Sequence, residues 1–339
     1  MIRSRLQRFH GRMSAPFVNA HERFVEREGL LFTLTHESGA EGQGEASPLP
    51  GFSRDTLEQC GAELETVRDF PSLFGSPKTV VQAIAAASSA LSMPAARHAL
   101  ETALFDLAGK LRGEPVWWLL RAASGGPQHV PSLMPLAAVI PMGEPEATVE
   151  QALATVARGV RTLKLKVGRD LTRELETLRS VRRAVGGGVE LRLDANRAFG
   201  AAQAREALAA FAPLRPELVE EPSDPLVESP VPLARDESLL DEPRADVAVW
   251  VLKPMALGGL TRCLELAARA RESDIDVIVS HLLDGPVALS AAAALSLAVG
   301  APNRAAGLYP HPGLGAWPER PLPAFTQANL IRRDTPGLG

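Results

Sequence analysis

The sequence predicts an α/β fold in which a smaller α+β domain precedes a (β/α)8-type (TIM) barrel. Strand-like and helix-like segments alternate from about residue 130 to residue 309, and polar residues end several of the strand-like runs. Residues 124–127 are rich in glycine and read as a linker between the two domains. A chain of 339 residues with 45 % hydrophobic residues can bury a core of this size.

The N-terminal domain is expected to span residues 1–126. Residues 29–36 are strand-like, whereas residues 39–51 are rich in glycine and proline and are predicted to form loop and turn. Helical patterns follow, and the clearest has apolar residues at three- and four-residue steps, namely Ala96, Ala99, Leu100, Ala103, Leu104 and Leu107. Strands followed by helices are typical of an α+β domain.

The barrel is expected to span residues 127–310. Its strands are predicted at 130–138, 162–167 and 189–194, in runs that end at Glu220, Asp236 and Lys253, and at 275–280 and 305–309. Its helices are predicted from about 146 and at 171–185, 201–211, 260–270 and 287–299. Only 16 residues separate Glu220 from Asp236, and four of the intervening residues are prolines, which disrupt helix interiors. We therefore expect the fourth and fifth helices to be missing or reduced to a turn.

Three lysines occupy strand positions that suit proton transfer. Lys164 and Lys166 are two residues apart in one strand, so their side chains point to the same face. Neighbouring ammonium groups repel, which makes one of them easier to deprotonate, and such a lysine can take a proton from carbon near neutral pH. Lys253 ends a later strand and is expected to face the pair across the barrel mouth. Lysines at strand ends could also be ordinary solvated charges on the rim, and for Lys164 taken alone that interpretation would be favoured.

Three carboxylates, Asp194, Glu220 and Asp236, end successive predicted strands and should converge at the same mouth. An all-oxygen ligand set suits Mg²⁺. Taken singly, each acid could cap a helix or lie in a loop, but three in register beside lysines favour a metal site. Asn196 and Ser238 follow two of these acids and could be hydrogen-bond donors to the site or simply turn formers.

Composition limits the partners and the compartment. The net charge of −4 gives no reason to expect nucleic acid or an anionic membrane as a partner. No apolar stretch approaches the ~18 residues of a membrane span, and the N-terminal residues lack the apolar core of a signal peptide. Cys60 and Cys263 form no metal-type spacing, and two unpaired thiols fit a reducing cytoplasm. We expect a cytoplasmic monomer or homo-oligomer that acts on a small molecule.

The chain resembles the enolase superfamily, in the muconate lactonizing enzyme-like branch that has lysines on the second and sixth barrel strands. The resemblance covers essentially the whole chain and is carried by residues 191–197, 219–222, 236–238 and 252–254. It implies a capping domain at the N-terminus, with a C-terminal segment of about 311–339 packing back on it. It also implies Mg²⁺, with Mn²⁺ as a possible substitute, held by Asp194, Glu220 and Asp236 while a lysine base forms an ene-diolate.

Within this branch the chain resembles the o-succinylbenzoate synthase family, through residues 44–53 of the capping domain, residues 191–199 and the Lys253-Pro254 pair. This implies a lyase of menaquinone biosynthesis that dehydrates a carboxylate substrate, 2-succinyl-6-hydroxy-2,4-cyclohexadiene-1-carboxylate, to o-succinylbenzoate. Lys166 would be the base, Lys164 would lower its pKa, and Lys253 would be the opposing cation. The N-succinylamino acid racemases and dipeptide epimerases of the superfamily carry the same lysines and are the alternative. A barrel without activity is disfavoured because all six positions are filled.

The substrate contacts are expected from Arg192, Asn196, Ser280, His281 and Asp284. The stretch 280–285 departs from the serine-rich turn that is usual after the seventh barrel strand of the family. His281 occupies the place of a catalytic histidine in the mandelate racemase branch, but that branch needs an aspartate where this chain has Lys253. We therefore predict a structural or substrate-contacting His281 rather than a base. Residues 16–28 are expected to be a mobile loop that closes the site.

Overall fold

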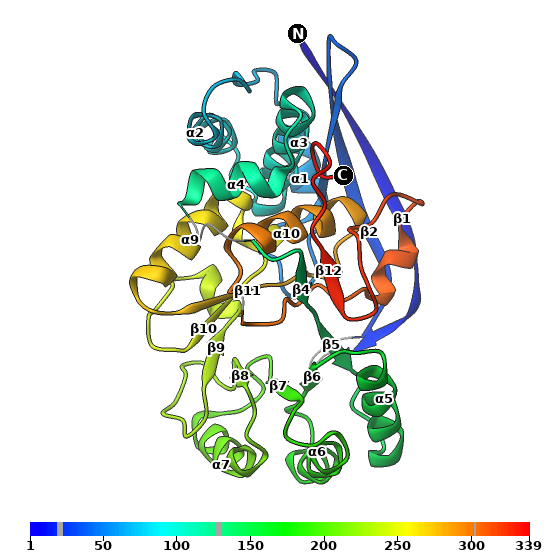
Figure 1. Ribbon diagram of the computed structural model, residues 1–339, viewed down its shortest axis with the longest axis vertical. Helices are drawn as coiled ribbons and strands as arrows, with labels where there is room; N and C mark the ends of the chain where they lie inside the picture. The colour runs from blue at the N-terminus through cyan, green and yellow to red at the C-terminus, as the bar shows by residue number, and fades with distance from the viewer. Residues whose placement is uncertain (19–22, 126–129, 302) are drawn as a thin grey trace.

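The computed structural model describes residues 1–18, 23–125, 130–301 and 303–339. Figure 1 shows the N-terminal helices at one end of the molecule and the barrel helices α5 (Pro145–Ala157), α6 (Leu171–Val185) and α7 (Ala201–Phe211) at the other. The strands of the barrel lie between these two ends. This arrangement confirms the predicted combination of an α+β capping region and a barrel of parallel strands.

The capping region is a three-stranded antiparallel sheet covered by helices. Its strands are β1 (Ile2–Val18), β2 (Arg23–His36) and β3 (Glu41–Ala46), and its helices are α1 (Leu57–Leu64), α2 (Pro77–Ser88), α3 (Pro94–Arg112) and α4 (Val116–Ser124). Helix α3 begins at a proline and ends before Gly113 in the left-handed conformation, the usual signals of a helix start and stop. The apolar face predicted for this helix is buried. Its packing against the sheet forms the core of the region.

The prediction that residues 39–51 form only loop and turn is wrong, because these residues include strand β3. The glycines of β3 do not mark a turn; they allow a helix to pack closely on the strand. A Cβ atom on Gly44 would lie 1.8 Å from the carbonyl oxygen of Ala99, and one on Gly42 would lie 2.2 Å from that of Ala103. Helix α3 therefore packs directly on the backbone of β3, and glycine is needed for that close approach.

The barrel sheet is parallel, in the order β11-β10-β9-β8-β7-β6-β5. These strands are β5 (Ala137–Ile140), β6 (Thr162–Lys166), β7 (Glu190–Asp194), β8 (Leu218–Glu220), β9 (Leu233–Arg235), β10 (Val249–Leu252) and β11 (Asp276–Val279). Residues 306 and 307 form the eighth stave, since Ala306 pairs with Leu136 and Gly307 with Ser280. Helices α9 (Leu260–Glu272) and α10 (Pro286–Val299) complete the alternation. Seven of the eight predicted barrel strands therefore form this sheet, whereas the eighth, predicted at 305–309, is present only as the isolated bridges of residues 306 and 307.

The fourth and fifth helices are reduced, as predicted. Residues 221–232, all of which the structure describes, contain no helix, and only the 3-10 turn η2 (Glu237–Leu240) separates β9 from β10. Other short helices are α8 (Pro254–Leu257), η1 (Ala212–Leu214) and η3 (Pro312–Ala316). The strand predicted at 130–138 is wrong in detail, because Leu133–Pro135 forms a separate strand, β4, which pairs with β12 (Asn329–Ile331). Pro135 has no N–H to donate, which suits a break between β4 and β5.

The segment 16–28 is mostly strand, in contrast to the mobile loop predicted. Residues 16–18 end β1 and residues 23–28 begin β2, while residues 19–22 lie outside the described residues. The predicted domain boundary near residue 126 also falls outside them, at residues 126–129. The C-terminal segment contacts the capping region, since the Val116 N–H donates to Gly337 and the Leu338 N–H donates to Asp106.

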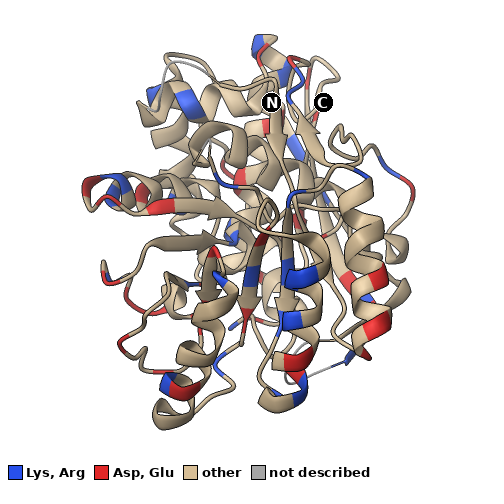
Figure 2. Cartoon of the chain, turned by 60° about the horizontal axis from the view of Figure 1, so that its bottom comes forward, with Lys and Arg blue, Asp and Glu red and all other residues tan. Residues whose placement is uncertain are grey.

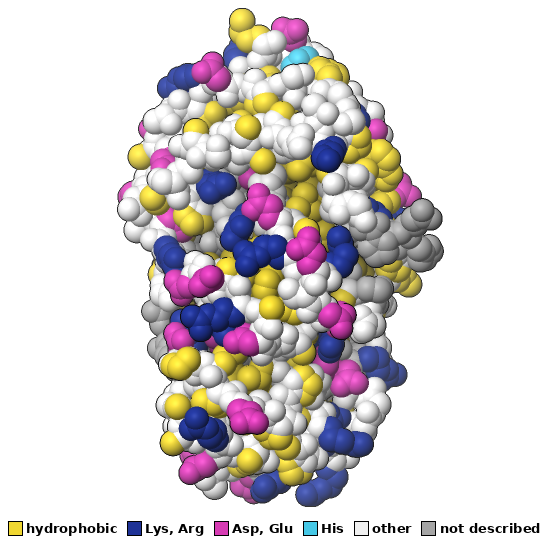
Figure 3. Space-filling model, turned by 90° about the vertical axis from the view of Figure 1, so that its left-hand side faces the viewer, with side chains coloured by type: hydrophobic (Ala, Val, Ile, Leu, Met, Phe, Trp, Pro, Cys, Tyr) yellow, Lys and Arg dark blue, Asp and Glu magenta, His cyan; other side chains and the backbone are white. Residues whose placement is uncertain are grey.

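The outer surface mixes charges of both signs. On the face shown in Figure 3, Lys and Arg side chains lie among Asp and Glu side chains and exposed apolar ones. Among the helices that the structure describes, none has the length and apolar character needed to cross a membrane.

Candidate active site

The ends of β6, β7 and β8 bring two lysines and two carboxylates together. Parallel pairing aligns Lys166 with Asp194 and Asp194 with Glu220. Lys164 Nζ lies 2.5 Å from Glu220 Oε2 and 2.9 Å from Asp194 Oδ2, and Lys166 Nζ lies 2.9 Å from the same Asp194 oxygen. In Figure 2, blue basic positions and red acidic positions lie close together on strands near the centre of the molecule.

One oxygen of Asp194 therefore lies between the two ammonium groups. Burial opposes the charge on Asp194, but Lys164, Lys166 and Lys253 outweigh it and hold the pKa of this carboxyl well below its usual range. Burial also opposes the charge on Lys164, but Asp194 and Glu220 outweigh it and raise the pKa of Lys164. The repulsion that the sequence predicts between the two lysines is thus offset by the carboxylates beside them.

Lys253 lies at the end of β10, four staves from β6. Its Nζ donates to Asp236 Oδ2 at 2.5 Å and lies 4.2 Å from the centroid of the Phe52 ring. Burial opposes its charge, but Asp236 and Glu237 outweigh it and raise the pKa of Lys253. On the other side, Lys166 Nζ lies 5.9 Å from the ring of Phe17. Each of these two lysines is therefore covered by an aromatic ring from the capping region.

Asp236 and Glu237 carry carboxylate oxygens that lack partners. Burial, reinforced by Glu237 and Glu220, raises the pKa of Asp236 to about 8. Among the described residues, Asp236 Oδ1 and Glu237 Oε2 are buried and have no hydrogen-bond partner. A buried acceptor without a partner costs about 1–3 kcal/mol, so such atoms in a native structure call for an explanation.

A hard cation would supply that explanation. Within the described residues no three His, Cys, Asp or Glu side chains are arranged to hold a metal ion, and Lys164 and Lys253 form ion pairs with Glu220 and Asp236. The donors that Asp194, Glu220 and Asp236 offer are nevertheless all oxygen, and one of them is unpartnered. The residues present therefore fit a divalent cation of the Mg²⁺ type.

The predicted substrate contacts fall into different places. Asn196 is in the site, where its Oδ1 accepts from Lys166 Nζ at 2.8 Å and its Nδ2 donates to Glu237 Oε1 at 2.8 Å. Arg192 is buried in the barrel interior, where its guanidinium donates to both oxygens of Glu217 and to the carbonyl of Ala305. This geometry favours a structural role for Arg192 over the substrate contact that we predicted.

The loop after β11 carries the other three predicted substrate contacts, Ser280, His281 and Asp284. Ser280 Oγ donates to the carbonyl of Gly307, on the stave that closes the barrel. The His281 ring lies 4.2 Å from the His311 ring, between centroids, and its Nδ1 accepts from the Leu283 N–H. Burial and the nearby Lys253 lower the pKa of His281 to about 3, so the ring is neutral. Burial and the nearby Glu45 raise the pKa of Asp284 to about 7.

Several residues around the site were not singled out from the sequence. Glu221 accepts hydrogen bonds from the backbone N–H groups of Asp236 and Ser238. Phe17 and Phe52 contact the lysines, and Glu237 bonds Asn196. Phe52, Glu221 and Glu237 lie in the family-like segments 44–53, 219–222 and 236–238, and Phe17 lies in the segment 16–28 that was expected to close the site. The sequence thus pointed to these segments but did not separate these residues from their neighbours.

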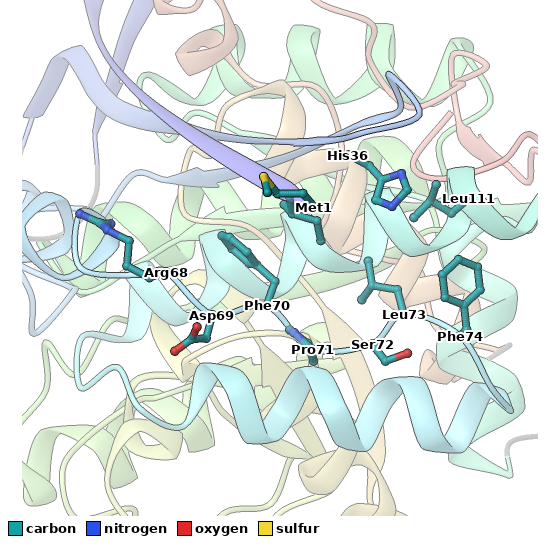
Figure 4. Close-up of a pocket in the computed structure, with 11 residues that line it drawn as sticks. Met1, His36, Arg68, Asp69, Phe70, Pro71, Ser72, Leu73, Phe74 and Leu111 are labelled. Carbon is teal, nitrogen blue, oxygen red and sulfur yellow. The ribbon is translucent and has the colours of Figure 1, made fainter.

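A separate hollow of about 370 Å³ lies in the capping region (Figure 4). Met1, Ile2 and His36 line it together with residues 68–74 and Leu111. The register of the sheet pairs Ile2 with His36, at the end of the β1–β2 strands opposite to Phe17. The hollow is therefore distinct from the site at the barrel mouth.

Two family models match the chain. Residues 147–339 match the family described as Enolase C-terminal domain-like, and residues 1–98 match the family described as MenC, N-terminal domain. The chain belongs to the enolase superfamily.

Curated relatives of this enolase superfamily member include both synthases and epimerases. An o-succinylbenzoate synthase of Desulfotalea psychrophila is 30 % identical, over 75 % of this chain and 79 % of that protein. A second, from Yersinia pseudotuberculosis, is 27 % identical over 96 % of this chain and 97 % of that protein. The L-Ala-D/L-Glu epimerase of Bacillus subtilis is 26 % identical over 86 % of this chain and 84 % of that protein. The chain is thus about equally similar to enzymes of two activities.

Solved structures share the fold over its full length. The L-Ala-D/L-Glu epimerase from Bacillus subtilis, in a substrate-liganded complex, has a TM-score of 0.82 and 22 % identity, and the match covers 99 % of this chain and 97 % of that one. Muconate lactonizing enzyme from Pseudomonas fluorescens has a TM-score of 0.82 and 23 % identity, with 99 % and 95 % covered. Dipeptide epimerase from Enterococcus faecalis was solved with Mg and a dipeptide, with a TM-score of 0.78, 22 % identity, and 100 % and 98 % covered.

Proposed function

We propose that this enzyme is an o-succinylbenzoate synthase, a hydro-lyase of menaquinone biosynthesis that converts 2-succinyl-6-hydroxy-2,4-cyclohexadiene-1-carboxylate to o-succinylbenzoate by syn-dehydration. The observation that carries the proposal is the match of residues 1–98 to the MenC N-terminal domain. This region lies over the site, since its Phe17 and Phe52 contact Lys166 and Lys253. Relatives with this printed activity at 27–30 % identity support the same choice.

Lys166 is the proposed base. It takes the proton from the carbon beside the substrate carboxylate, and in a syn elimination the same ammonium can return that proton to the departing hydroxide. Asn196 accepts from Lys166 Nζ at 2.8 Å, so it fixes the direction of the amine. Lys164 stands on the same strand face and holds Asp194 and Glu220 through its ammonium group.

Lys253 is the proposed counter-cation on the other side of the substrate. Its short contact with Asp236 and the Phe52 ring above it keep the ammonium in one position, where it faces the charge that develops on the substrate. The rings of Phe17 and Phe52 exclude water from the two lysines, which strengthens these interactions.

Asp194, Glu220 and Asp236 are the proposed ligands of Mg²⁺, with Mn²⁺ as a possible substitute. When bound, Mg²⁺ supplies a Lewis acid that stabilises the second negative charge gained by the substrate carboxylate on proton loss. The side chains contribute the oxygen donors. The Asn196 N–H donates to the Asp194 carboxylate, and the Glu221 carboxylate accepts from the Asp236 N–H, so these bonds help to place two of the three acids.

An N-succinylamino acid racemase is the second candidate. It is favoured by the placement of Lys166 and Lys253 on opposite sides of the mouth, from which two lysines could act on both faces of a carbon acid. A relative from Bacillus cereus named N-succinyl-L-Arg/Lys racemase is 24 % identical over 81 % of this chain and 78 % of that protein.

The free thiols support a location in the cytoplasm. Cys60 and Cys263 are both buried and unpaired, and burial raises the pKa of each thiol, so neither is a reactive thiolate. We propose a cytoplasmic enzyme whose partner is a small carboxylate substrate.

The experiment that tests the proposal incubates the purified protein with Mg²⁺ and the cyclohexadiene carboxylate, and follows o-succinylbenzoate by proton NMR. A parallel sample receives an N-succinylamino acid or a dipeptide in D₂O, where epimerisation exchanges the α-proton. We expect turnover of the cyclohexadiene substrate. Absence of dehydration together with fast α-proton exchange would refute the synthase assignment.

A further inference from the structure

The guanidinium of Arg27 joins the capping region to the loop after β11. Arg27 lies on β2 and is only 4 % exposed. It donates to the carbonyl oxygens of Leu283 at 3.1 Å and Leu282 at 3.5 Å on the barrel side, and to those of Ser47 at 2.6 Å and Pro48 at 3.2 Å on the capping side. All four acceptors are backbone carbonyls, so the contact fixes the course of the chain in both segments.

Glu45 holds the other end of the same loop. It lies on β3, is fully buried, and accepts from the Gly285 N–H at 2.6 Å and the Ala288 N–H at 3.1 Å. These N–H groups belong to the first turn of α10, which has no side-chain cap of its own. A carboxylate is stabilising at a helix N-terminus, and here it comes from the capping region instead of the helix.

The loop held in this way carries His281 next to the catalytic groups. The charge of Lys253 acts on the His281 ring, and that ring stacks on His311. The backbone of the loop is also packed closely, since a Cβ on Gly285 would lie 2.5 Å from the Trp317 ring and 2.6 Å from Glu45 Oε2. The position of this wall of the mouth therefore depends on contacts made outside the barrel.

We propose that Arg27 and Glu45 are positioning residues, which hold residues 281–285 against the barrel mouth and thereby set the affinity for the substrate. They touch no reacting atom and act through the loop. The choice of substrate in the test rests on the proposed function. Because a misplaced loop weakens ground state and transition state alike, its loss raises KM more than it lowers kcat.

Glu101 provides a matched control. It is also a fully buried carboxylate of the capping region, and it accepts from the N–H and the hydroxyl of Thr261, in the first turn of α9. Its third partner is Ser88 Oγ. Among the described residues no hydrogen bond or ion pair joins the Glu101 side chain to residues 280–285, so Glu101→Gln disturbs an equivalent interdomain cap at a different helix.

The test compares Glu45→Gln and Arg27→Lys with Glu101→Gln in the full-length enzyme. Hydrogen–deuterium exchange is followed in peptides that cover residues 280–290 and 258–264, and KM and kcat are measured with the cyclohexadiene carboxylate. Glu45→Gln and Arg27→Lys should speed exchange in the first peptide and raise KM about tenfold, with kcat within about threefold. Glu101→Gln should speed exchange only in the second peptide and leave KM unchanged.

The two readouts separate the possible failures. The positioning role is refuted if Glu45→Gln and Arg27→Lys both leave KM and the rate of hydrogen–deuterium exchange in residues 280–290 at wild-type values. It is also refuted if Glu101→Gln raises KM as much as these two variants do. If the wild type does not dehydrate the substrate, the proposed function fails, and the exchange pattern still decides whether Arg27 and Glu45 hold the loop. Arg27→Lys serves if Glu45→Gln does not fold, because lysine keeps the charge but cannot span four carbonyls.

Discussion

The carboxylate of Glu221 holds the turn that carries Asp236. Its Oε1 accepts from the Asp236 N–H at 2.8 Å, the Ser238 N–H at 2.9 Å and the Ser238 hydroxyl at 2.5 Å, while its Oε2 faces Arg197. Glu221 itself has a positive φ of 38°, a strained conformation for a residue with a side chain. The interactions of the carboxylate therefore maintain a backbone geometry that the chain would not adopt by itself.

Replacement of Glu221 by alanine removes the shared acceptor of these donors. Two buried N–H groups would lose their partner, at about 1–3 kcal/mol each, and the turn would relax. Loss of a side chain that orients a metal ligand typically costs 10–100-fold in metal affinity. We therefore predict that Glu221→Ala raises the Kd for Mg²⁺ by about 10–100-fold, whereas Glu221→Gln, which keeps one oxygen acceptor, changes it by less than about threefold.

Isothermal titration with Mg²⁺ alone measures both variants without reference to turnover. Circular dichroism shows whether each variant is folded. A folded Glu221→Ala variant that binds Mg²⁺ as tightly as the wild type would refute the role of Glu221 in placing Asp236. Equal weakening by alanine and glutamine would show that the charge matters, and not the acceptor geometry.

Three further predictions concern metal, base and stability. Dehydration should stop in excess chelator and return with Mg²⁺, and Asp236→Asn should raise the Mg²⁺ concentration needed for half-maximal activity; full turnover in chelator would contradict the metal assignment. Lys166→Ala should abolish dehydration with an unchanged circular dichroism spectrum, but activity that survives Lys166→Ala and is lost in Lys164→Ala would exchange the two roles. Burial lowers the pKa of His98 to about 4, so the unfolded chain binds the proton first and stability falls as the pH drops below about 6.5. Between pH 7.5 and pH 5 the free energy of unfolding, measured with urea, should therefore fall by about 2 kcal/mol less in His98→Gln than in the wild type. An equal fall in the two proteins would contradict a buried neutral His98.

Much of the barrel could be predicted because its signals are local. Helices α6 and α7 have the predicted bounds, since their apolar residues recur with helical spacing and Asp170 caps the first of them. The prolines of residues 222–232 marked the missing fourth helix. Strand β3 was missed because its glycines serve the approach of helix α3, a tertiary contact that has the same local appearance as a turn.

The candidate site could be predicted in part for the same reason. Strand ends meet at one mouth, so Lys164, Lys166, Asp194 and Glu220 were expected to lie together, and their side chains do contact one another. The alternation of side-chain direction along a strand shows which face a residue lies on, but it does not show how deep in the barrel the side chain lies. Arg192 therefore could not be separated from Asp194 by pattern, although it lies in the barrel interior.

The segments of the capping region that reach the barrel were predicted, at residues 16–28 and 44–53, but the individual contacts that their side chains make were not. Phe17, Arg27, Glu45 and Phe52 reach the barrel only because two distant segments pack together, and no periodicity records such packing. They are ordinary strand or loop residues in the sequence alone. Their roles follow from distances and burial.

The measurement that tests the central claim most directly uses Lys253→Arg. Arginine keeps the cation but cannot exchange a proton near neutral pH, so it separates a counter-ion from an acid–base residue. If the enzyme is a synthase with Lys166 as base, Lys253→Arg retains measurable dehydration, reduced mainly by altered geometry, and loses any racemisation of an N-succinylamino acid. Both reactions are measured on the same preparation. Complete loss of dehydration in a folded Lys253→Arg variant, or a wild type that epimerises a dipeptide and dehydrates nothing, would contradict the account.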